Sequence, residues 1–140
     1  MGAGDGDDSL LDTIISPVSG TGVVVTANNS SLENLRVNTQ AIRGVAPFVA
    51  SAVGISLGAN LTNISITGVT STDNSVGLRV GSDLVVNGLT VADSHFDGNS
   101  GQGWYFAEET APAGNVTNVL VTNTTFNNNV NKGIYVEKLD

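Results

Sequence analysis

A four-residue pattern of alternating apolar positions recurs along the chain, and each copy begins with glycine. Its five copies are Gly22–Val25, Gly54–Leu57, Gly77–Val80, Gly103–Phe106 and Gly133–Val136. Alternation with a period of two is typical of a β-strand, with one face buried and the other turned outward. Self-similarity at a spacing of about 20–50 residues indicates a repeat architecture. The pattern therefore predicts one short strand in each of several repeats.

A second pattern follows each of the first four copies, with asparagine or glycine before the alternating apolar residues. Its copies are Asn34–Val37, Asn63–Ile66, Gly88–Val91 and Asn118–Val121. We expect the four leading residues to stack at one corner of the fold. Asparagine and glycine tolerate the left-handed backbone of a sharp corner, and stacked amides can hydrogen-bond between repeats.

A third, shorter strand is suggested by Phe96 and Phe126, each seven residues before the next repeat glycine. Three short strands per repeat, separated by asparagine and glycine turns, predict one coil of a parallel solenoid. Stacked coils share a continuous apolar interior. Residues 1–140 would then form a single all-β domain of about 4–5 coils. A β-sandwich also suits short strands with frequent turns, but it gives no reason for two patterns repeated in a fixed order.

The segment 124–136 reads Asn-x-Phe-x-x-Asn-x-x-x-Gly-Ile-x-Val, with Thr124 in the first asparagine place. It resembles the right-handed parallel β-helix repeat of pectate-lyase-like proteins, and the opening Gly2–Gly6 is similar to an early coil of such proteins. The resemblance covers nearly the whole chain and implies a right-handed parallel β-helix. That superfamily includes lyases, hydrolases, epimerases, phage tailspikes and adhesins, so the resemblance implies a fold and not one function.

Composition and charge narrow the range of partners. Thirteen acidic against five basic residues give a formal net charge of −8. This disfavours nucleic acid, because phosphate binding needs a basic face. The chain has no cysteine, and no apolar run approaches the length of a membrane span. The acidic, glycine-rich start is unlike a signal peptide, and only four residues follow Val136. We therefore expect a domain truncated at both ends relative to a longer parent.

The outward positions of the first strand set are the leading candidates for ligand binding. Alternation places Ser56, Arg79, Tyr105 and Tyr135 one above another, roughly 4.8 Å apart. Tyrosine rings beside a guanidinium can stack on sugar faces and hold a carboxylate or hydroxyls. Glu108 and Glu109, in the segment that follows Tyr105, would wall the groove. The partner would be a polysaccharide, although tyrosine is also common at exposed strand positions with no ligand.

A second cluster contains His95 with Asp93 and Asp97. Histidine is the usual proton carrier near neutral pH, and flanking carboxylates can orient it. The pectate-lyase-like resemblance implies lyases that use calcium and an arginine or lysine base, for which Arg79 is the candidate. That role needs an acidic neighbour such as Asp73 or Asp83. The chain has no Asp-Pro-His sequence of the alginate epimerase kind, and we expect no complete catalytic site.

Calcium is the one cofactor for which the sequence offers candidates. Residues 3–11 fit the calcium nonapeptide Gly-Gly-x-Gly-x-Asp-x-apolar-x at every position except the first. Asp5, Asp7 and Asp8 are the candidate ligands. Such repeats share calcium ligands with neighbouring copies, but this chain contains a single copy. The same acidic residues therefore also fit a solvated end of a β-helix.

These observations favour an extracellular or surface β-helix module of a microbe or phage, with a structural or glycan-contacting role. One alternative is a fragment or relative of a polysaccharide lyase or epimerase acting on acidic glycans. Another is a self-assembling fibre or tailspike-like subunit. A solenoid end exposes unpaired strand edges that would drive such end-to-end stacking.

Overall fold

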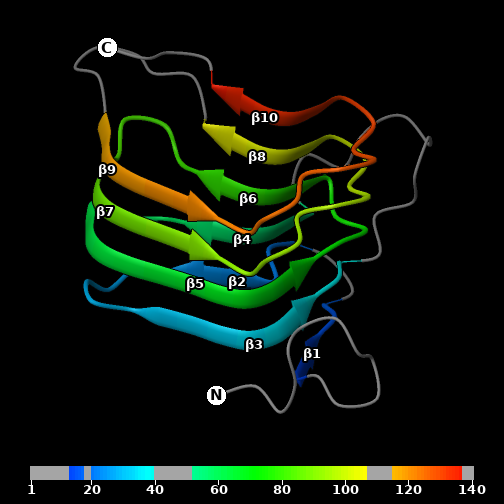
Figure 1. The fold of residues 1–140 in the computed structure, drawn as a ribbon, viewed down its shortest axis with the longest axis horizontal. Helices are drawn as coiled ribbons and strands as arrows, with labels where there is room; N and C mark the ends of the chain where they lie inside the picture. Colours follow the sequence, from blue (N-terminus) through cyan, green and yellow to red (C-terminus); the bar gives the residue numbers. More distant parts are fainter. Residues whose placement is uncertain (1–12, 18–19, 40–51, 107–114, 137–140) are drawn as a thin grey trace.

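The chain winds into a solenoid with two parallel sheets on its sides (Figure 1). The computed structural model describes residues 13–17, 20–39, 52–106 and 115–136. Sheet A contains β1 (Thr13–Ile15), β3 (Ser31–Val37), β5 (Leu61–Ser71), β7 (Val85–Ala92) and β9 (Asn115–Thr122). Sheet B contains β2 (Val23–Val25), β4 (Val53–Leu57), β6 (Val76–Val80), β8 (Gln102–Phe106) and β10 (Lys132–Val136).

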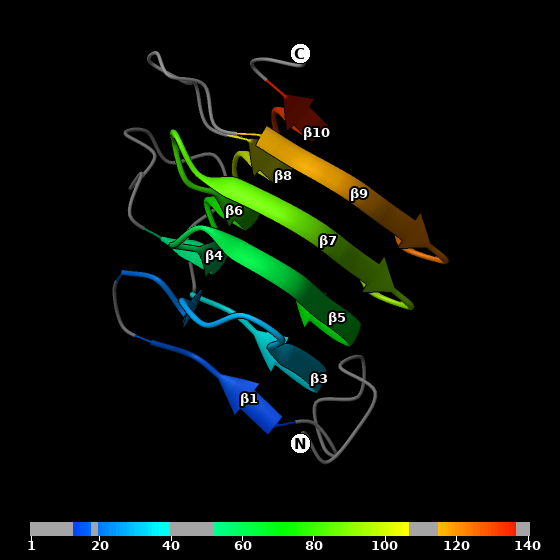
Figure 2. The ribbon, with the colours of Figure 1, turned by 90° about the vertical axis from the view of Figure 1, so that its left-hand side faces the viewer.

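Odd-numbered strands lie in one sheet and even-numbered strands in the other, so each turn of the chain adds a strand to both sheets. Every strand pair is parallel. Figure 2 shows β3, β5, β7 and β9 stacked in order. Five strands per sheet match the predicted 4–5 coils, and no helix occurs in the described ranges. The parallel β-helix expectation is confirmed.

The predicted third strand is present in reduced form. It consists of β1 and the carboxyl ends of β3 and β5, followed by single bridges from Thr70 to His95 and from His95 to Thr125. In the later coils, left-handed residues lie close together on either side of this segment. Asp93 has φ 49° and Gly98 has φ 66°. Only four residues separate these corners, which leaves room for one bridge instead of a ladder.

The interior between the sheets is aliphatic, with aromatic rings toward the C-terminal coils. Inward residues of the middle strands, including Ile55, Ile66, Leu78 and Val91, are fully buried. Phe96 stacks on Phe126 with ring centroids 5.6 Å apart. The alternation read from the glycine pattern therefore assigns the inward face of sheet B correctly.

The glycines that open the sheet B pattern are required by close packing between coils. A Cβ on Gly77 would lie 2.6 Å from the carbonyl oxygen of Gly103, and one on Gly103 would lie 2.6 Å from that of Gly133. Such contacts are shorter than real Cβ atoms show. None of the five glycines has a positive φ. Steric room, and not backbone conformation, explains why this position repeats as glycine.

The predicted corner stack is wrong at its first member. Asn63, Gly88 and Asn118 share one register, but Leu35 pairs with Val69, which places Asn34 beside Gly68. The sequence interval from Asn34 to Asn63 is 29 residues, whereas the β3–β5 register advances by 34 (Leu35 to Val69).

Asn29 fills the place that we expected Asn34 to take. Its Oδ1 accepts a 3.1 Å hydrogen bond from Asn63 Nδ2. Asn34 instead begins a second corner column with Gly68, Asp93 and Asn123, all at positive φ.

A buried asparagine ladder closes the corner that precedes sheet B. Asn74 Nδ2 donates to Asn99 Oδ1 at 3.1 Å, and Asn99 Nδ2 donates to Asn129 Oδ1 at 3.0 Å. The same oxygens accept the backbone N–H groups of Asn74 and Asn99. Asn74 and Asn99 are fully buried. The ladder satisfies backbone donors that would be costly to leave unpaired in the interior.

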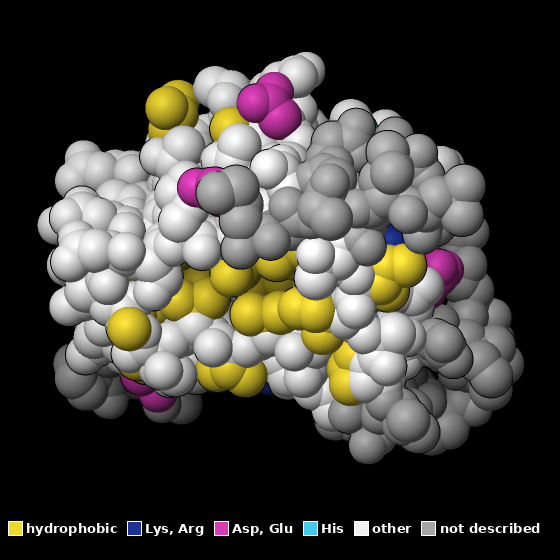
Figure 3. Space-filling view, turned by 90° about the horizontal axis from the view of Figure 1, so that it is seen from below, with side chains coloured by type: hydrophobic (Ala, Val, Ile, Leu, Met, Phe, Trp, Pro, Cys, Tyr) yellow, Lys and Arg dark blue, Asp and Glu magenta, His cyan; other side chains and the backbone are white. Residues whose placement is uncertain are grey.

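The two ends of the solenoid differ from its middle. In the last coil the inward-facing Val119, Val121 and Ile134 are 41%, 38% and 48% exposed, because no further described coil packs on them. Figure 3 looks onto the opposite end, near β1 and β3, and shows a band of apolar side chains across its centre. Val23 and Leu32 at that end are only partly buried.

Candidate functional site

The outer face of sheet B carries the predicted column of side chains. The strand register aligns Ser56 with Arg79, Arg79 with Tyr105, and Tyr105 with Tyr135. We call these four residues the sheet B stripe. All four are partly exposed. The prediction that these side chains form one outward-facing column is confirmed.

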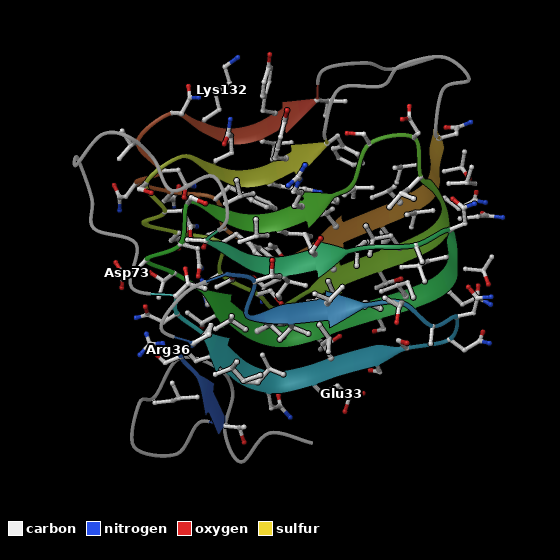
Figure 4. The ribbon with its side chains drawn as sticks, turned by 180° about the vertical axis from the view of Figure 1, so that it is seen from behind. Glu33, Arg36, Asp73 and Lys132 are labelled. Atoms are coloured by element: carbon white, nitrogen blue, oxygen red, sulfur yellow. The ribbon has the colours of Figure 1, made fainter. Side chains whose placement is uncertain are left out.

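The two tyrosine rings of the sheet B stripe stack on each other, and we call this pair the aromatic platform. Their ring centroids are 5.7 Å apart, and the ring planes differ by 9°. The ammonium of Lys132 lies 3.7 Å from the centre of the Tyr135 ring. Figure 4 shows Lys132 on β10, at the C-terminal coil. A cation over a tyrosine face is attracted by the negative face of the ring.

Sequence reasoning missed Lys132. Strict alternation from Tyr135 places Lys132 on the inward side, but the alternation breaks at Gly133. A Cβ on Gly133 would meet Phe126, an interior residue. Two consecutive inward positions, Gly133 and Ile134, therefore return Lys132 to the outer face. The signal was the glycine itself, which opens the sheet B pattern in every coil.

A groove of about 440 Å³ runs beside the stripe. It is lined by Val53, Ser75, Val76, Arg79, Gly101, Gln102, Tyr105, Val130 and Asn131. This mixture of apolar and polar lining residues suits a ligand with both apolar surface and polar groups. The lining residues come from neighbouring coils, so the groove runs across the strands.

Positive charge is concentrated here despite the acidic chain. Of the three basic residues in the described ranges, Arg79 and Lys132 lie on this face, and Arg36 lies on the third face with Thr70 and His95. The Nε of Arg79 is buried and has no hydrogen-bond partner among the described residues. Arg79 as a whole is partly exposed, so the other N–H groups of its guanidinium remain available to an acceptor on a ligand.

The second predicted cluster lies on the third face, away from the stripe. His95 Nδ1 is 2.9 Å from Thr125 Oγ1, and Thr125 Oγ1 donates to Asp97 Oδ2 at 2.6 Å. His95 and Asp97 are thus brought together through Thr125. Asp93 instead accepts from Asn123 at 2.7 Å. Arg79 lies on sheet B, so the structure does not join it to His95 in one site.

The acidic neighbours considered for Arg79 lie at turns. Asp73 precedes β6 at a left-handed corner, and its Oδ2 accepts a hydrogen bond from Asn38 at 3.3 Å. Figure 4 shows Asp73 on the same side of the molecule as Arg36. Asp83 follows β6 at another left-handed position.

Several predicted residues lie outside the described ranges. Glu108 and Glu109 fall in 107–114, and the calcium candidates Asp5, Asp7 and Asp8 fall in 1–12. Within the described ranges, no group of three or more histidine or acidic residues is arranged to hold a metal ion. The same ranges contain no helix long and apolar enough to cross a membrane.

Comparison with known proteins agrees with this architecture. The family model for the right handed beta helix region matches residues 3–139. The chain therefore belongs to the right-handed β-helix family. No curated protein and no solved structure matches the chain.

Proposed function

We propose that the sheet B stripe binds an extended acidic polysaccharide and that the chain is a rigid glycan-contacting module without a catalytic step. The observation that carries this proposal is the alignment of Arg79, Tyr105 and Tyr135 on successive coils, with Lys132 over the last ring. Platform and cations lie on one rigid sheet, so little ordering is needed when a ligand binds.

The chemistry of the stripe favours an anionic ligand that also has apolar C–H surface. The stacked rings of Tyr105 and Tyr135 offer apolar contact area to the C–H groups of a sugar chain. The guanidinium of Arg79 can pair with a carboxylate through parallel hydrogen bonds. Uronic acid polymers combine both features. An extracellular or cell-surface location, which is part of the proposal, would give the module access to such polymers.

A glycan array tests the proposal most broadly. We expect the protein to bind acidic polymers such as polygalacturonate and alginate, and Tyr105→Ala to lose most of that signal. Thr90→Ala removes a partly exposed side chain from the outward face of β7 in sheet A, away from the stripe, and serves as the control. Equal binding by the wild type and by Tyr105→Ala would contradict the proposed site.

The lyase alternative has its own readout. Eliminative cleavage of uronate polymers creates a conjugated double bond that absorbs in the ultraviolet. We expect no increase in absorbance with polygalacturonate or alginate. A steady increase that Arg79→Gln abolishes would replace the binding proposal by the lyase one.

The exposed inward residues of the last coil favour a second candidate function, end-to-end self-association. Val119, Val121 and Ile134 present apolar area that a coil of a second copy would bury. Size-exclusion chromatography with light scattering should then show concentration-dependent oligomers. Val121→Lys should prevent them, whereas Leu120→Lys, on the outward face of the same strand, should not. A monomer at all concentrations would exclude this function.

A further inference from the structure

The hydrogen bonds around His95 determine which ring nitrogen carries the proton. A threonine hydroxyl has one proton, and Thr125 donates it to Asp97 at 2.6 Å. The Thr125 oxygen must therefore accept in its 2.9 Å contact with His95 Nδ1. Nδ1 carries the hydrogen in the neutral ring, and Nε2 is left with its lone pair as an acceptor.

Asp97 is itself held in place at the far end of this relay. Its second oxygen, Oδ1, accepts from the backbone N–H of Asn127. Because Asp97 is bonded through both oxygens, its carboxylate has little freedom to turn away from Thr125. The three side chains thus form an ordered chain of hydrogen bonds across two neighbouring coils.

The backbone beneath the relay is fixed as well. The N–H of His95 donates to the carbonyl of Val69, and the His95 carbonyl accepts from Ser71, both at 2.8 Å. The next residue, Phe96, is fully buried and stacks on Phe126. His95 is therefore presented to solvent from a rigid position, with its side chain 40% exposed. A preorganised acceptor of this kind favours binding because little freedom is lost.

His95 and Thr125 line a second groove, of about 370 Å³, on this face. Its edge is the left-handed corner column Asn34, Gly68, Asp93 and Asn123. Besides His95, its lining contains a carboxylate and two amides but no lysine or arginine. The Asp93 carboxylate would repel an anion and can accept hydrogen bonds from hydroxyl groups. The groove thus fits a neutral ligand rich in hydroxyl donors.

The neighbouring position of the same column offers another polar atom. Thr70 bridges to His95 and is 4% exposed, yet its Oγ1 has no hydrogen-bond partner among the described residues. Buried hydroxyls are normally bonded to protein or to ordered water. Thr70 therefore carries a hydroxyl that is unsatisfied within the described part of the chain, at the position next to His95 in this column.

We propose that His95 is the centre of a second binding site, specific for a neutral hydroxylated chain such as an uncharged oligosaccharide. Nε2 accepts one ligand hydroxyl, and Asp93 accepts another. The relay from Asp97 through Thr125 keeps the proton on Nδ1. Thr125 and Asp97 are positioning residues, because they act through His95. This site differs in place and in charge from the sheet B stripe and does not depend on the function proposed for it.

Nitrogen-15 NMR at pH 8 tests the tautomer directly, because His95 is the single histidine of the chain. We expect the wild type to show a protonated Nδ1. Thr125→Val should lose this preference, and Thr125→Ser, which keeps the hydroxyl, should restore it. A wild-type ring protonated at Nε2 would overturn the relay.

Titration with cellohexaose and maltohexaose, followed by the same ring signals, tests the ligand class. At least one of them should shift the His95 signals in a saturable way. Asp93→Asn, which keeps the size of the side chain, and Thr125→Val should each weaken binding about tenfold. Arg79→Gln should leave it unchanged. Absence of any shift with both hexasaccharides at millimolar concentration would overturn the site.

Discussion

Two columns of outward side chains run up this solenoid, and they differ in chemistry although the same architecture produces both. The sheet B stripe contains Ser56, Arg79 and two stacked tyrosines, and Lys132 lies beside it. The column on the third face, which we call the His95 column, contains Arg36, Thr70, His95 and Thr125. A β-helix fixes where an outward residue lies but leaves its type free. Ligand specificity therefore depends on which residue types occupy each column.

The backbone under the two columns also differs. Arg79, Tyr105 and Tyr135 stand on regular strands of a continuous sheet. His95 and Thr125 stand on isolated bridges between left-handed corners. Fewer sheet hydrogen bonds fix the His95 column, and it depends more on buried side chains such as Phe96. Substitutions in the interior should affect the two columns unequally.

The largest effect is expected from Phe96→Ala, which removes the buried ring beneath the His95 column. Truncation of a fully buried phenylalanine costs about 3–5 kcal/mol of unfolding free energy. Urea denaturation measures this cost. Phe126→Ala is the matched control: Phe126 is only partly buried, and we expect a smaller loss. Equal losses of unfolding free energy would show that the difference in burial between Phe96 and Phe126 does not determine how much each ring stabilises the fold.

Gly103→Ala applies the corresponding change beneath the sheet B stripe. The new Cβ would lie 2.6 Å from the Gly133 carbonyl oxygen and 2.7 Å from that of Phe96. Backbone atoms cannot yield easily, so we expect a loss of about 3 kcal/mol. Gly20→Ala introduces the same methyl where no atom lies within 4 Å, although its φ of 84° adds a cost from backbone strain. Thermal unfolding should show a much larger decrease for Gly103→Ala, and a wild-type melting temperature would contradict the steric account.

Arg79→Gln should weaken binding of an acidic hexasaccharide by about 10- to 100-fold. Hydrogen bonds to charged groups contribute about 1.5–3 kcal/mol. Arg36→Gln removes the same charge from the other column and has the same buried, unpartnered Nε, so it controls for net charge. Isothermal titration calorimetry at low salt measures both. An equal effect of the two variants would mean that only overall charge matters.

Tyr135→Ala gives the smallest effect, a weakening of about three- to tenfold. The variant removes half of the aromatic platform, while Tyr105 remains, and aromatic contacts contribute about 0.5–1.5 kcal/mol. Tyr135→Phe keeps the ring and should bind as the wild type does. Failure of Tyr135→Phe to bind would assign the interaction to the hydroxyl and not to the ring face.

The strands of sheet B and their outward residues could be predicted from the sequence. Glycine and the alternating apolar residues occupy positions that packing between coils requires. The predicted position of Asn34 was wrong, because asparagine is suited to every left-handed corner. Two different corner columns contain asparagine and glycine, so the residue type alone does not distinguish them. The register of β3 against β5 depends on how many residues lie between corners, which alternation alone does not reveal.

The exposure of inward residues in the last coil could not be predicted from the sequence either. Val91 and Val121 occupy the same column, yet Val91 is fully buried and Val121 is 38% exposed. The pattern shows which way a side chain points, whereas burial depends on what stacks above it. The pairing of His95 with Thr125 and Asp97 likewise requires the 30-residue register between coils.

The central claim is that the two columns are separate surfaces with different ligand preferences. Its most direct test is an NMR titration with hexagalacturonate that follows the rings of the two tyrosines and the single histidine. We expect saturable shifts of the Tyr105 and Tyr135 signals, with the His95 signals unchanged. Shifts of His95 with the tyrosine signals unmoved would contradict it.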